Sequence, residues 1–204
     1  MQRSIHARVA RGELQETWIV VEHDPVVTLG RNADPAHLRV SRELLAARGI
    51  DCVEIERGGD ATYHGPGQLV VYPIRRLERF REVVPLVRAL ESAVIAACAQ
   101  FGIAATQWHE HAGVWVEDRC ICAVGLAIQQ MTSLHGIALN VSTALTYDEL
   151  ITPCGLANRG ITSMEREAAR SVTLDEAKPA VLRAFEALFD LRFVHEAHAL
   201  AMAS

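Results

Sequence analysis

Residues 57–72 read RGGDATYHGPGQLVVY, and this stretch decides how the chain is organised. Four glycines and a proline surround an arginine, a threonine, a histidine and a glutamine. Apolar runs on both sides, at 52–56 and 68–74, predict two strands joined by this loop. Glycine lets a backbone adopt positive φ and approach a ligand closely, and loop N–H groups can face a carbonyl or an anion. A tight hairpin needs only about two to five loop residues, so the stretch predicts a loop that faces a ligand.

The rest of the chain shows a mixture of strand and helix patterns. Strands are expected at residues 17–22, 26–29, 52–56, 68–74, 114–116, 121–128 and 137–141. Helices are expected at residues 2–12, 41–48, 82–101 and from 173 onward. Because these elements do not alternate regularly, they predict an α/β (α+β) fold, with a mixed, largely antiparallel sheet flanked by helices. We expect one domain, residues 1–204, without a linker.

Composition excludes several classes of protein. The chain has 204 residues, of which 50% are hydrophobic, and a net charge of −5. This charge argues against a nucleic-acid binder that relies on global charge. No apolar run reaches the length of a membrane span, and the N-terminus lacks the apolar segment of a signal peptide. Five cysteines without an export signal predict free thiols and a cytoplasmic location.

Four stretches, taken in order, resemble the lipoyl(octanoyl) transferase family. They are E-H-x-P-V-V-T-L-G-R at 22–31, R-G-G-x-x-T-Y-H-G-P-G-Q-x-V-x-Y at 57–72, G-L-x-I…H-G-I-A-L-N-V at 125–141 and P-C-G at 153–155. The resemblance covers nearly the whole chain. It implies the fold of the biotin and lipoate protein ligase catalytic domain, here without the strand that the family usually carries first.

The resemblance also implies a reaction. Members of the family transfer an octanoyl group from acyl carrier protein to a lysine of lipoyl domains, such as those of E2 subunits and the glycine cleavage H protein. The acyl group passes through a cysteine thioester, and neither a cofactor nor a metal ion takes part. Cys154 falls on the P-C-G nucleophile. Its segment has little apolar periodicity, so we expect it to meet a pocket more readily than Cys98, which lies in a predicted helix.

The residues implied to bind the acyl substrate lie in three segments. They are Arg57, Gly58, Gly59, Asp60, Ala61, Thr62, Tyr63 and His64; Ala123, Val124 and Gly125; and His135, Gly136, Ile137 and Ala138. Small residues suit a tunnel for a thin aliphatic chain, although Gly125 and Gly136 could equally mark strand bulges. His64 and His135 are expected to hold the acyl carbonyl or to relay a proton.

One position departs from the family pattern. The family pairs its cysteine with a lysine five residues before the glycine at 125, and this chain has Cys120 there. Arg119 is adjacent, but neighbouring residues of a strand face opposite sides. The cation that would lower the thiol pKa is therefore missing or comes from elsewhere. Three alternatives stay open: a histidine activates the thiol, the enzyme is impaired or repurposed, or Cys120 pairs with Cys154 under oxidation.

The sequence leaves three alternatives to this function. An ATP-dependent lipoate or biotin ligase on the same fold would use an active-site lysine, which is absent, and would not need Cys154. A catalytically impaired acyl-binding homologue stays open because of Cys120. A metal site at Cys120 and Cys122 is a further alternative, since C-x-C on a strand places both thiols on one face. No second C-x-x-C or H-x-x-x-H pattern supports it.

Overall fold

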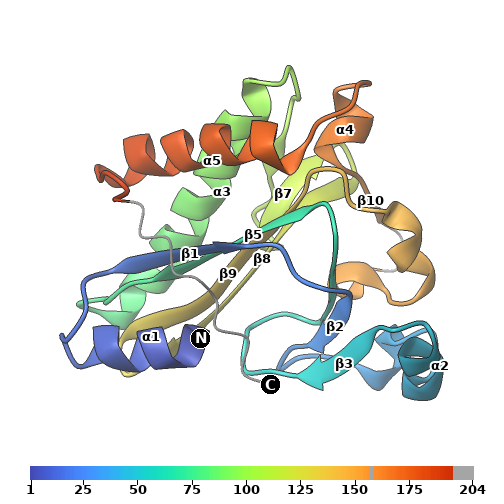
Figure 1. Cartoon of the computed structure of the whole chain (residues 1–204), viewed down its shortest axis with the longest axis horizontal. Coiled ribbons are helices and arrows are strands. Elements are labelled where there is room, and N and C mark those ends of the chain that lie inside the picture. Colours follow the sequence, from blue (N-terminus) through green and yellow to red (C-terminus); the bar gives the residue numbers. More distant parts are fainter. Residues whose placement is uncertain (157–158, 195–204) are drawn as a thin grey trace.

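A computed structural model describes residues 1–156 and 159–194 of the chain. Its centre is a seven-stranded sheet in the order β1-β5-β9-β8-β7-β6, with β10 paired to β8 (Figure 1). The strands are β1 (Thr17–Val21), β5 (Gln68–Ile74), β6 (Thr106–Gln107), β7 (Gly113–Val116), β8 (Arg119–Gln129), β9 (Thr132–Asn140) and β10 (Gly160–Ile161). Neighbouring strands are antiparallel except β10, which runs parallel to β8. The predicted mixed, largely antiparallel sheet flanked by helices is therefore confirmed.

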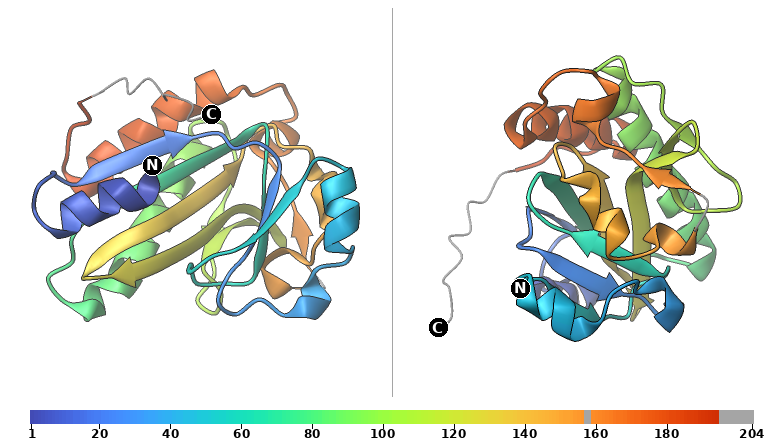
Figure 2. Two further views of the ribbon diagram at one scale, coloured as in Figure 1. Left: turned by 60° about the horizontal axis from the view of Figure 1, so that its bottom comes forward. Right: turned by 90° about the vertical axis from the view of Figure 1, so that its right-hand side faces the viewer.

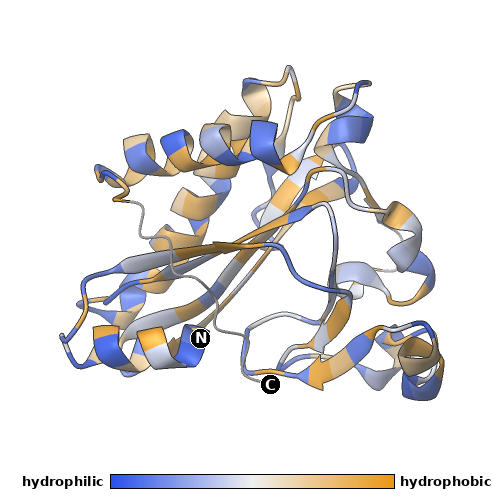
Figure 3. Ribbon diagram, viewed as in Figure 1, coloured by the Kyte–Doolittle hydropathy of each residue, from blue (hydrophilic) through white to orange (hydrophobic). Residues whose placement is uncertain are grey.

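Helices cover both faces of this sheet because side chains of its strands alternate between two cores. They are α1 (Gln2–Ala10), α3 (Val83–Ala99), α4 (Met164–Glu167) and α5 (Leu174–Phe189). Trp18 and Val20 of β1 contact the core under α3 and α5, whereas Ile19 contacts the core under α1. Figure 3 shows α5 with hydrophobic and hydrophilic residues interspersed along its length, as expected for a helix with one buried side. None of the helices in the described ranges is long and apolar enough to cross a membrane.

A second, three-stranded sheet lies beside the first (Figure 2). Its strands are β2 (Val26–Leu29), β3 (Asp51–Glu54) and β4 (Ala61–His64), with β2 parallel to β3 and antiparallel to β4. Helix α2 (Arg42–Ala47) buries Leu45 against this sheet, and the Ser41 side chain accepts a hydrogen bond from the backbone N–H of Leu44 as its N-cap. Short 3-10 helices connect the elements at Pro35–His37, Phe80–Glu82, Leu145–Glu149 and Pro153–Gly155.

Strand β4 corrects the sequence prediction. The glycine-rich stretch was expected to be a loop joining two strands, but its middle is itself a strand paired with β2. The expected strands at 52–56 and 68–74 belong to different sheets as β3 and β5. Four residues between glycines are too few to show a period, so pairing with β2 decides this strand. The stretch therefore leads the chain from one sheet to the other.

Candidate active site

A cavity of about 340 Å³ lies at the junction of the two sheets. The three segments implied to bind the acyl group meet in its wall: Arg57, Gly58, Gly59, Asp60, Thr62 and His64; Ala123, Val124 and Gly125; and His135, Gly136, Ile137 and Ala138. Ala61 and Tyr63 instead line a small void of about 20 Å³, which also touches Thr62, Cys120, Ala123 and Ala138. The sequence prediction thus brought together residues that are far apart in the chain, and the structure places them around one cavity.

Arg57 is a buried cation in this wall. Its Nε and Nη2 donate to Thr28 Oγ1 at 3.2 and 2.8 Å, and Nη2 also donates to the Thr28 carbonyl at 2.7 Å. Its Nη1 donates to the Gly58 carbonyl at 3.1 Å. The backbone N–H of Gly58 donates to the Leu126 carbonyl at 2.8 Å, which ties the glycine-rich stretch to β8. A fixed positive charge therefore lies where the two sheets meet.

His64 lies at the end of β4 and is 8% exposed. Its Nδ1 is 2.8 Å from Gln68 Oε1, and its Nε2 is 3.4 Å from Thr28 Oγ1. Burial lowers the pKa of His64 to about 4, although the hydrogen bond with Gln68 opposes this shift. The imidazole is therefore neutral at neutral pH.

His135 lies across the cavity on β9, and its backbone conformation and hydrogen bonding differ from those of His64. Its φ is +60°, a left-handed conformation that residues other than glycine seldom adopt. Its buried Nε2 has no hydrogen-bond partner within the described part of the chain, and it lies 3.8 Å from Glu56 Oε2. Burial lowers the pKa of His135, and the carboxylate of Glu56 opposes this shift. Glu56 in turn accepts a hydrogen bond from Arg3 at 2.9 Å.

The Pro153–Gly155 turn, which carries Cys154, lies beside the small void and against Asp60 of the larger cavity's wall. Pro153 lines the small void, and Gly155 lies so close to Asp60 that a Cβ there would be 2.7 Å from Asp60 Oδ2. Gly155 also has a φ of +71°, so glycine is strongly favoured at this position. Asp60, which lines the larger cavity, is 2.6 Å from His37 Nδ1. The turn thus reaches the small void through Pro153 and contacts the cavity wall through Gly155 and Asp60, while the Cys154 side chain lies outside what the structure describes.

Comparison with known proteins identifies the family. The chain matches the family described as "Lipoyl protein ligase A/B catalytic domain" over residues 1–186. An octanoyltransferase of Koribacter versatilis is 43% identical, with 88% of this chain and 74% of that protein aligned. An octanoyltransferase of Nitratidesulfovibrio vulgaris is 44% identical, with 93% and 87% aligned. The chain belongs to the octanoyltransferases of the lipoyl protein ligase A/B family.

Solved structures show the same fold in related ligases. A lipoate-protein ligase A bound with ATP aligns with 96% of this octanoyltransferase-family chain and 83% of its own, at a TM-score of 0.78 and 18% identity. A putative lipoate protein ligase of T. acidophilum with bound lipoic acid aligns with 98% and 85%, at a TM-score of 0.76 and 19% identity. At this identity the likeness establishes the fold and not the reaction.

Cys120 occupies the position at which the sequence resemblance implies a lysine. A β-bulge determines which way its side chain faces. Val114 pairs with Cys122 while the next residue of β7, Trp115, pairs with Cys120, so β8 holds one extra residue at Ile121. Cys120 and Ala123 consequently line the same small void, whereas Ile121 and Cys122 both lie in the core under the helices.

The contacts of β8 bear on the expected roles of Cys120, Cys122 and Arg119. The expectation that Cys120 and Cys122 share a face is wrong, because the bulge interrupts the alternation between them. The described residues contain no group of three or more histidine, cysteine or acidic side chains arranged to hold a metal ion. Arg119 pairs with Glu167 at 3.2 Å and Glu117 at 2.9 Å and lines neither cavity. It is therefore no substitute for the lysine of the octanoyltransferase pattern.

Sequence reasoning missed several residues of the wall. They are Thr28, Ile55, Tyr72, Val83, Val87, His111, Ala112 and Leu126. Thr28 and Tyr72 lie within stretches that resemble the family, so the motifs themselves offered a signal. Burial raises the pKa of Tyr72 to about 12, and its hydroxyl is 2.7 Å from His23 Nε2. Val83 and Val87 reach the cavity from α3, which no local motif indicates.

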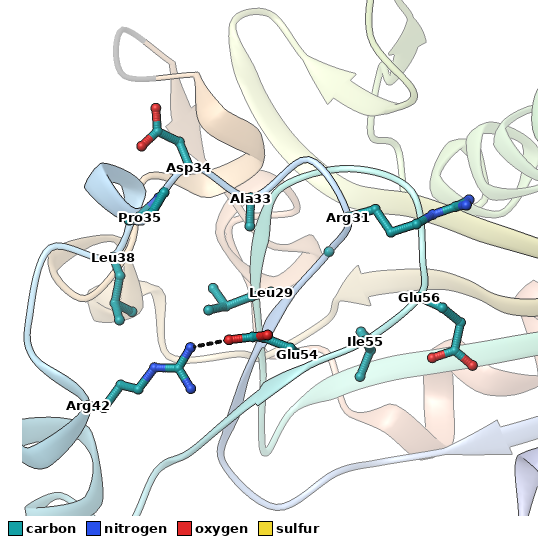
Figure 4. Close-up of a pocket in the computed structure, with 11 residues that line it drawn as sticks. Leu29, Arg31, Ala33, Asp34, Pro35, Leu38, Arg42, Glu54, Ile55 and Glu56 are labelled. Carbon is teal, nitrogen blue, oxygen red and sulfur yellow. Dashed lines mark hydrogen bonds and ion pairs between the residues drawn. The ribbon is translucent and has the colours of Figure 1, made fainter.

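A more open pocket of about 610 Å³ adjoins the site and was not anticipated (Figure 4). It lies between the segment after β2 and the end of β3, and an Arg42–Glu54 ion pair of 2.6 Å spans it. Ile55 lines both this pocket and the 340 Å³ cavity. The pocket and the cavity therefore adjoin each other at Ile55, just before the glycine-rich stretch.

Proposed function

We propose that the protein transfers an octanoyl group from acyl carrier protein to Cys154, and from there to a lysine of a lipoyl domain. The observation that carries the proposal is the cavity itself, where small residues of β8 and β9 face the glycine-rich stretch beside the Cys154 turn. A largely apolar space near the proposed nucleophile suits a linear acyl chain. The relatives at 43% and 44% identity are octanoyltransferases, which supports the same acyl group here.

The proposed chemistry has two acyl-transfer steps. First the Cys154 sulfur attacks the carrier thioester carbonyl, and the C–S bond to the carrier breaks as the carrier thiolate leaves. Then the neutral lysine amine of the acceptor attacks the new thioester, and Cys154 leaves as thiolate while an amide forms. Each attack needs a group that takes up a proton and donors that stabilise the oxyanion. His64, a neutral imidazole in the wall, is the proposed proton acceptor in place of the family lysine.

The acceptor and the location follow from this reaction. One structural relative, an archaeal bipartite lipoate protein ligase, was characterised together with its E2 lipoyl domain. We propose that lipoyl domains of this kind supply the lysine here, and that the reaction takes place in the cytoplasm, where thiols stay reduced.

Mass spectrometry of the intact protein tests the proposal. Incubation with octanoyl-acyl carrier protein, without ATP, should add one hydroxylamine-labile octanoyl group, and addition of a lipoyl domain should discharge it. Cys154→Ala should form no adduct. Cys98→Ala and Cys52→Ala should still form it, because burial raises the pKa of the Cys98 thiol to about 12 and also raises that of Cys52. Octanoylation of the lipoyl domain only with free octanoate and ATP would favour a ligase instead, and no modification under either condition would favour an impaired homologue.

A further inference from the structure

A chain of hydrogen-bonded amides lines the small void and ends at His64. Asn140 Nδ2 donates to the Thr162 carbonyl at 3.0 Å and to the Tyr147 hydroxyl at 3.1 Å. Gln68 Nε2 donates to Asn140 Oδ1 at 2.9 Å and to the Tyr63 carbonyl at 3.2 Å. Gln68 Oε1 lies 2.8 Å from His64 Nδ1. Gln68 and Asn140 are 2% and 3% exposed, so water does not compete for these contacts.

The chain has a direction because a backbone carbonyl can only accept a hydrogen bond. The Thr162 carbonyl requires the Asn140 nitrogen on its side, which turns Asn140 Oδ1 toward Gln68. The Tyr63 carbonyl requires the Gln68 nitrogen, which turns Gln68 Oε1 toward His64. Turning either amide round would place two oxygens or two N–H groups against each other in a buried site. His64 Nδ1 must therefore carry a hydrogen and donate it to Gln68.

The contacts on the other side of the ring are compatible with this assignment. Two N–H groups of Arg57 donate to Thr28 Oγ1, so the Thr28 hydroxyl hydrogen must point to another acceptor. The acceptors near it are His64 Nε2 and the Thr62 carbonyl, both at 3.4 Å. A neutral imidazole with hydrogen on Nδ1 has a free electron pair on Nε2. Nothing on this side requires Nε2 to donate.

We propose that Gln68 and Asn140 are positioning residues that hold His64 in its Nδ1–H tautomer, so that Nε2 accepts the proton released in acyl transfer. This inference rests on the proposed function. In the first step Nε2 takes the Cys154 thiol proton as sulfur bonds to the acyl carbon, and returns it to the departing carrier thiolate. In the second step Nε2 takes the ammonium proton formed as the amine attacks, and returns it to the Cys154 thiolate. His64 Nε2 does not donate to the oxyanion before it has received a proton.

Nitrogen-15 NMR of the histidine-labelled, ligand-free protein tests the tautomer without relying on activity. At pH 7 the His64 signals should show a protonated Nδ1 and an unprotonated Nε2, with His64→Gln providing the assignment. In Gln68→Met, which keeps the length of the side chain but removes its oxygen and nitrogen, the two tautomers should interconvert and the signals should average. A protonated Nε2 in the wild type, or an unchanged tautomer in Gln68→Met, would overturn the inference while leaving the proposed function intact.

Kinetics supply the second readout. Gln68→Met should lower the acylation rate of Cys154 by about 10²-fold. Gln107→Met is the matched control, because Gln107 also donates two hydrogen bonds, to the Arg88 carbonyl and Ser92 Oγ, but lines neither cavity. Equal rate losses in the two variants would reduce Gln68 to a structural role and contradict the inference. An adduct that forms on no cysteine in the wild type would instead contradict the proposed function.

Gln68→Glu gives a third readout, the pH dependence of the acylation rate. A carboxylate at this position would still accept from Nδ1–H but would raise the pKa of His64, because an opposite charge favours the imidazolium. The other titratable or charged groups near the ring, Arg57, His23 and His135, lower its pKa and remain in place. The acid limb of the acylation rate should therefore move to higher pH in Gln68→Glu. An acid limb unchanged from that of the wild type would contradict the inference.

Discussion

The two walls of the cavity place a histidine in opposite conditions. On the β4 wall, His64 has ordinary backbone geometry, a short contact to Gln68 and a neighbouring chain of amides. On the β9 wall, His135 has a φ of +60° and a buried Nε2 without a hydrogen-bond partner in the described residues. Hydrogen bonds therefore orient the His64 ring before any substrate binds. His135, in contrast, has a strained backbone and a buried ring nitrogen without a hydrogen-bond partner in the described residues.

This difference suggests a division of labour. Strain and unsatisfied polar groups are tolerated where a ligand later makes use of them. The β4 wall therefore suits proton transfer, which needs a fixed tautomer. The β8–β9 wall, with its alanines, glycines and unsatisfied imidazole, suits recognition of the acyl group.

Replacing each histidine by alanine should have the largest effect on the rate. His64→Ala should lower the rate of acyl transfer by about 10²- to 10⁴-fold, the usual effect of losing a general base. His135→Ala should lower it by about 10-fold, mainly through KM, since it removes a single hydrogen-bonding group from recognition. Single-turnover acylation of Cys154 measures both. Equal losses in kcat for the two variants would mean that the walls do not differ in role.

Acid should destabilise the protein through His64. Its pKa is about 4 in the folded protein, against about 6.5 in the unfolded chain, so the unfolded state binds more protons between these values. Stability should be complete above about pH 6.5 and fall by about 3 kcal/mol as pH drops to 4. Urea unfolding across this range should show a smaller loss in His64→Gln. The exposed His109→Gln serves as a control, and an identical pH dependence in wild type and His64→Gln would contradict the burial of a neutral ring.

The β8–β9 wall should set the length of the acyl chain. Ala138 is 5% exposed and lines both cavities, so Ala138→Val adds two methyl groups at the space for the chain. Transfer of octanoyl relative to hexanoyl should fall by about 10- to 200-fold, the range for a misfit of one methylene group. Ala127→Val is the control, because Ala127 is equally buried but faces the core under α1. An unchanged preference in Ala138→Val would assign chain length to another part of the wall.

Restoring a lysine at position 120 should have the mildest effect. A cation beside the thiol favours the thiolate, so Cys120→Lys should lower the pH midpoint of Cys154 alkylation by about one unit, or about 1.4 kcal/mol. The small void holds only about 20 Å³, so some loss of stability from crowding is expected as well. Cys120→Met controls for size. Coincident titration curves for wild type and Cys120→Lys would mean that another group already activates the thiol.

The sequence predicted those features that depend on long or motif-bearing segments. The bounds of β2 and β5 agree with the prediction, as does the Ser41 N-cap of α2. The three segments expected to bind the acyl group also line one cavity, and their binding role remains a prediction. Strand β4 was missed because its four residues show no period between glycines. Residues such as Val83 reach the cavity through the packing of α3, which a single sequence does not reveal.

The bulge in β8 shows how a backbone irregularity can determine which side chain lines a site. Counting back by twos from Gly125 along a uniform strand leads to Ala123, Ile121 and then Arg119, and would leave Cys120 on the far side. The extra residue at Ile121 shifts the alternation by one, so Cys120 lines the void and Arg119 turns to Glu167. One inserted residue therefore decides whether an arginine or a cysteine lines the void beside the Pro153–Gly155 turn. The register of a strand, and not only its residue types, is part of the chemistry of this site.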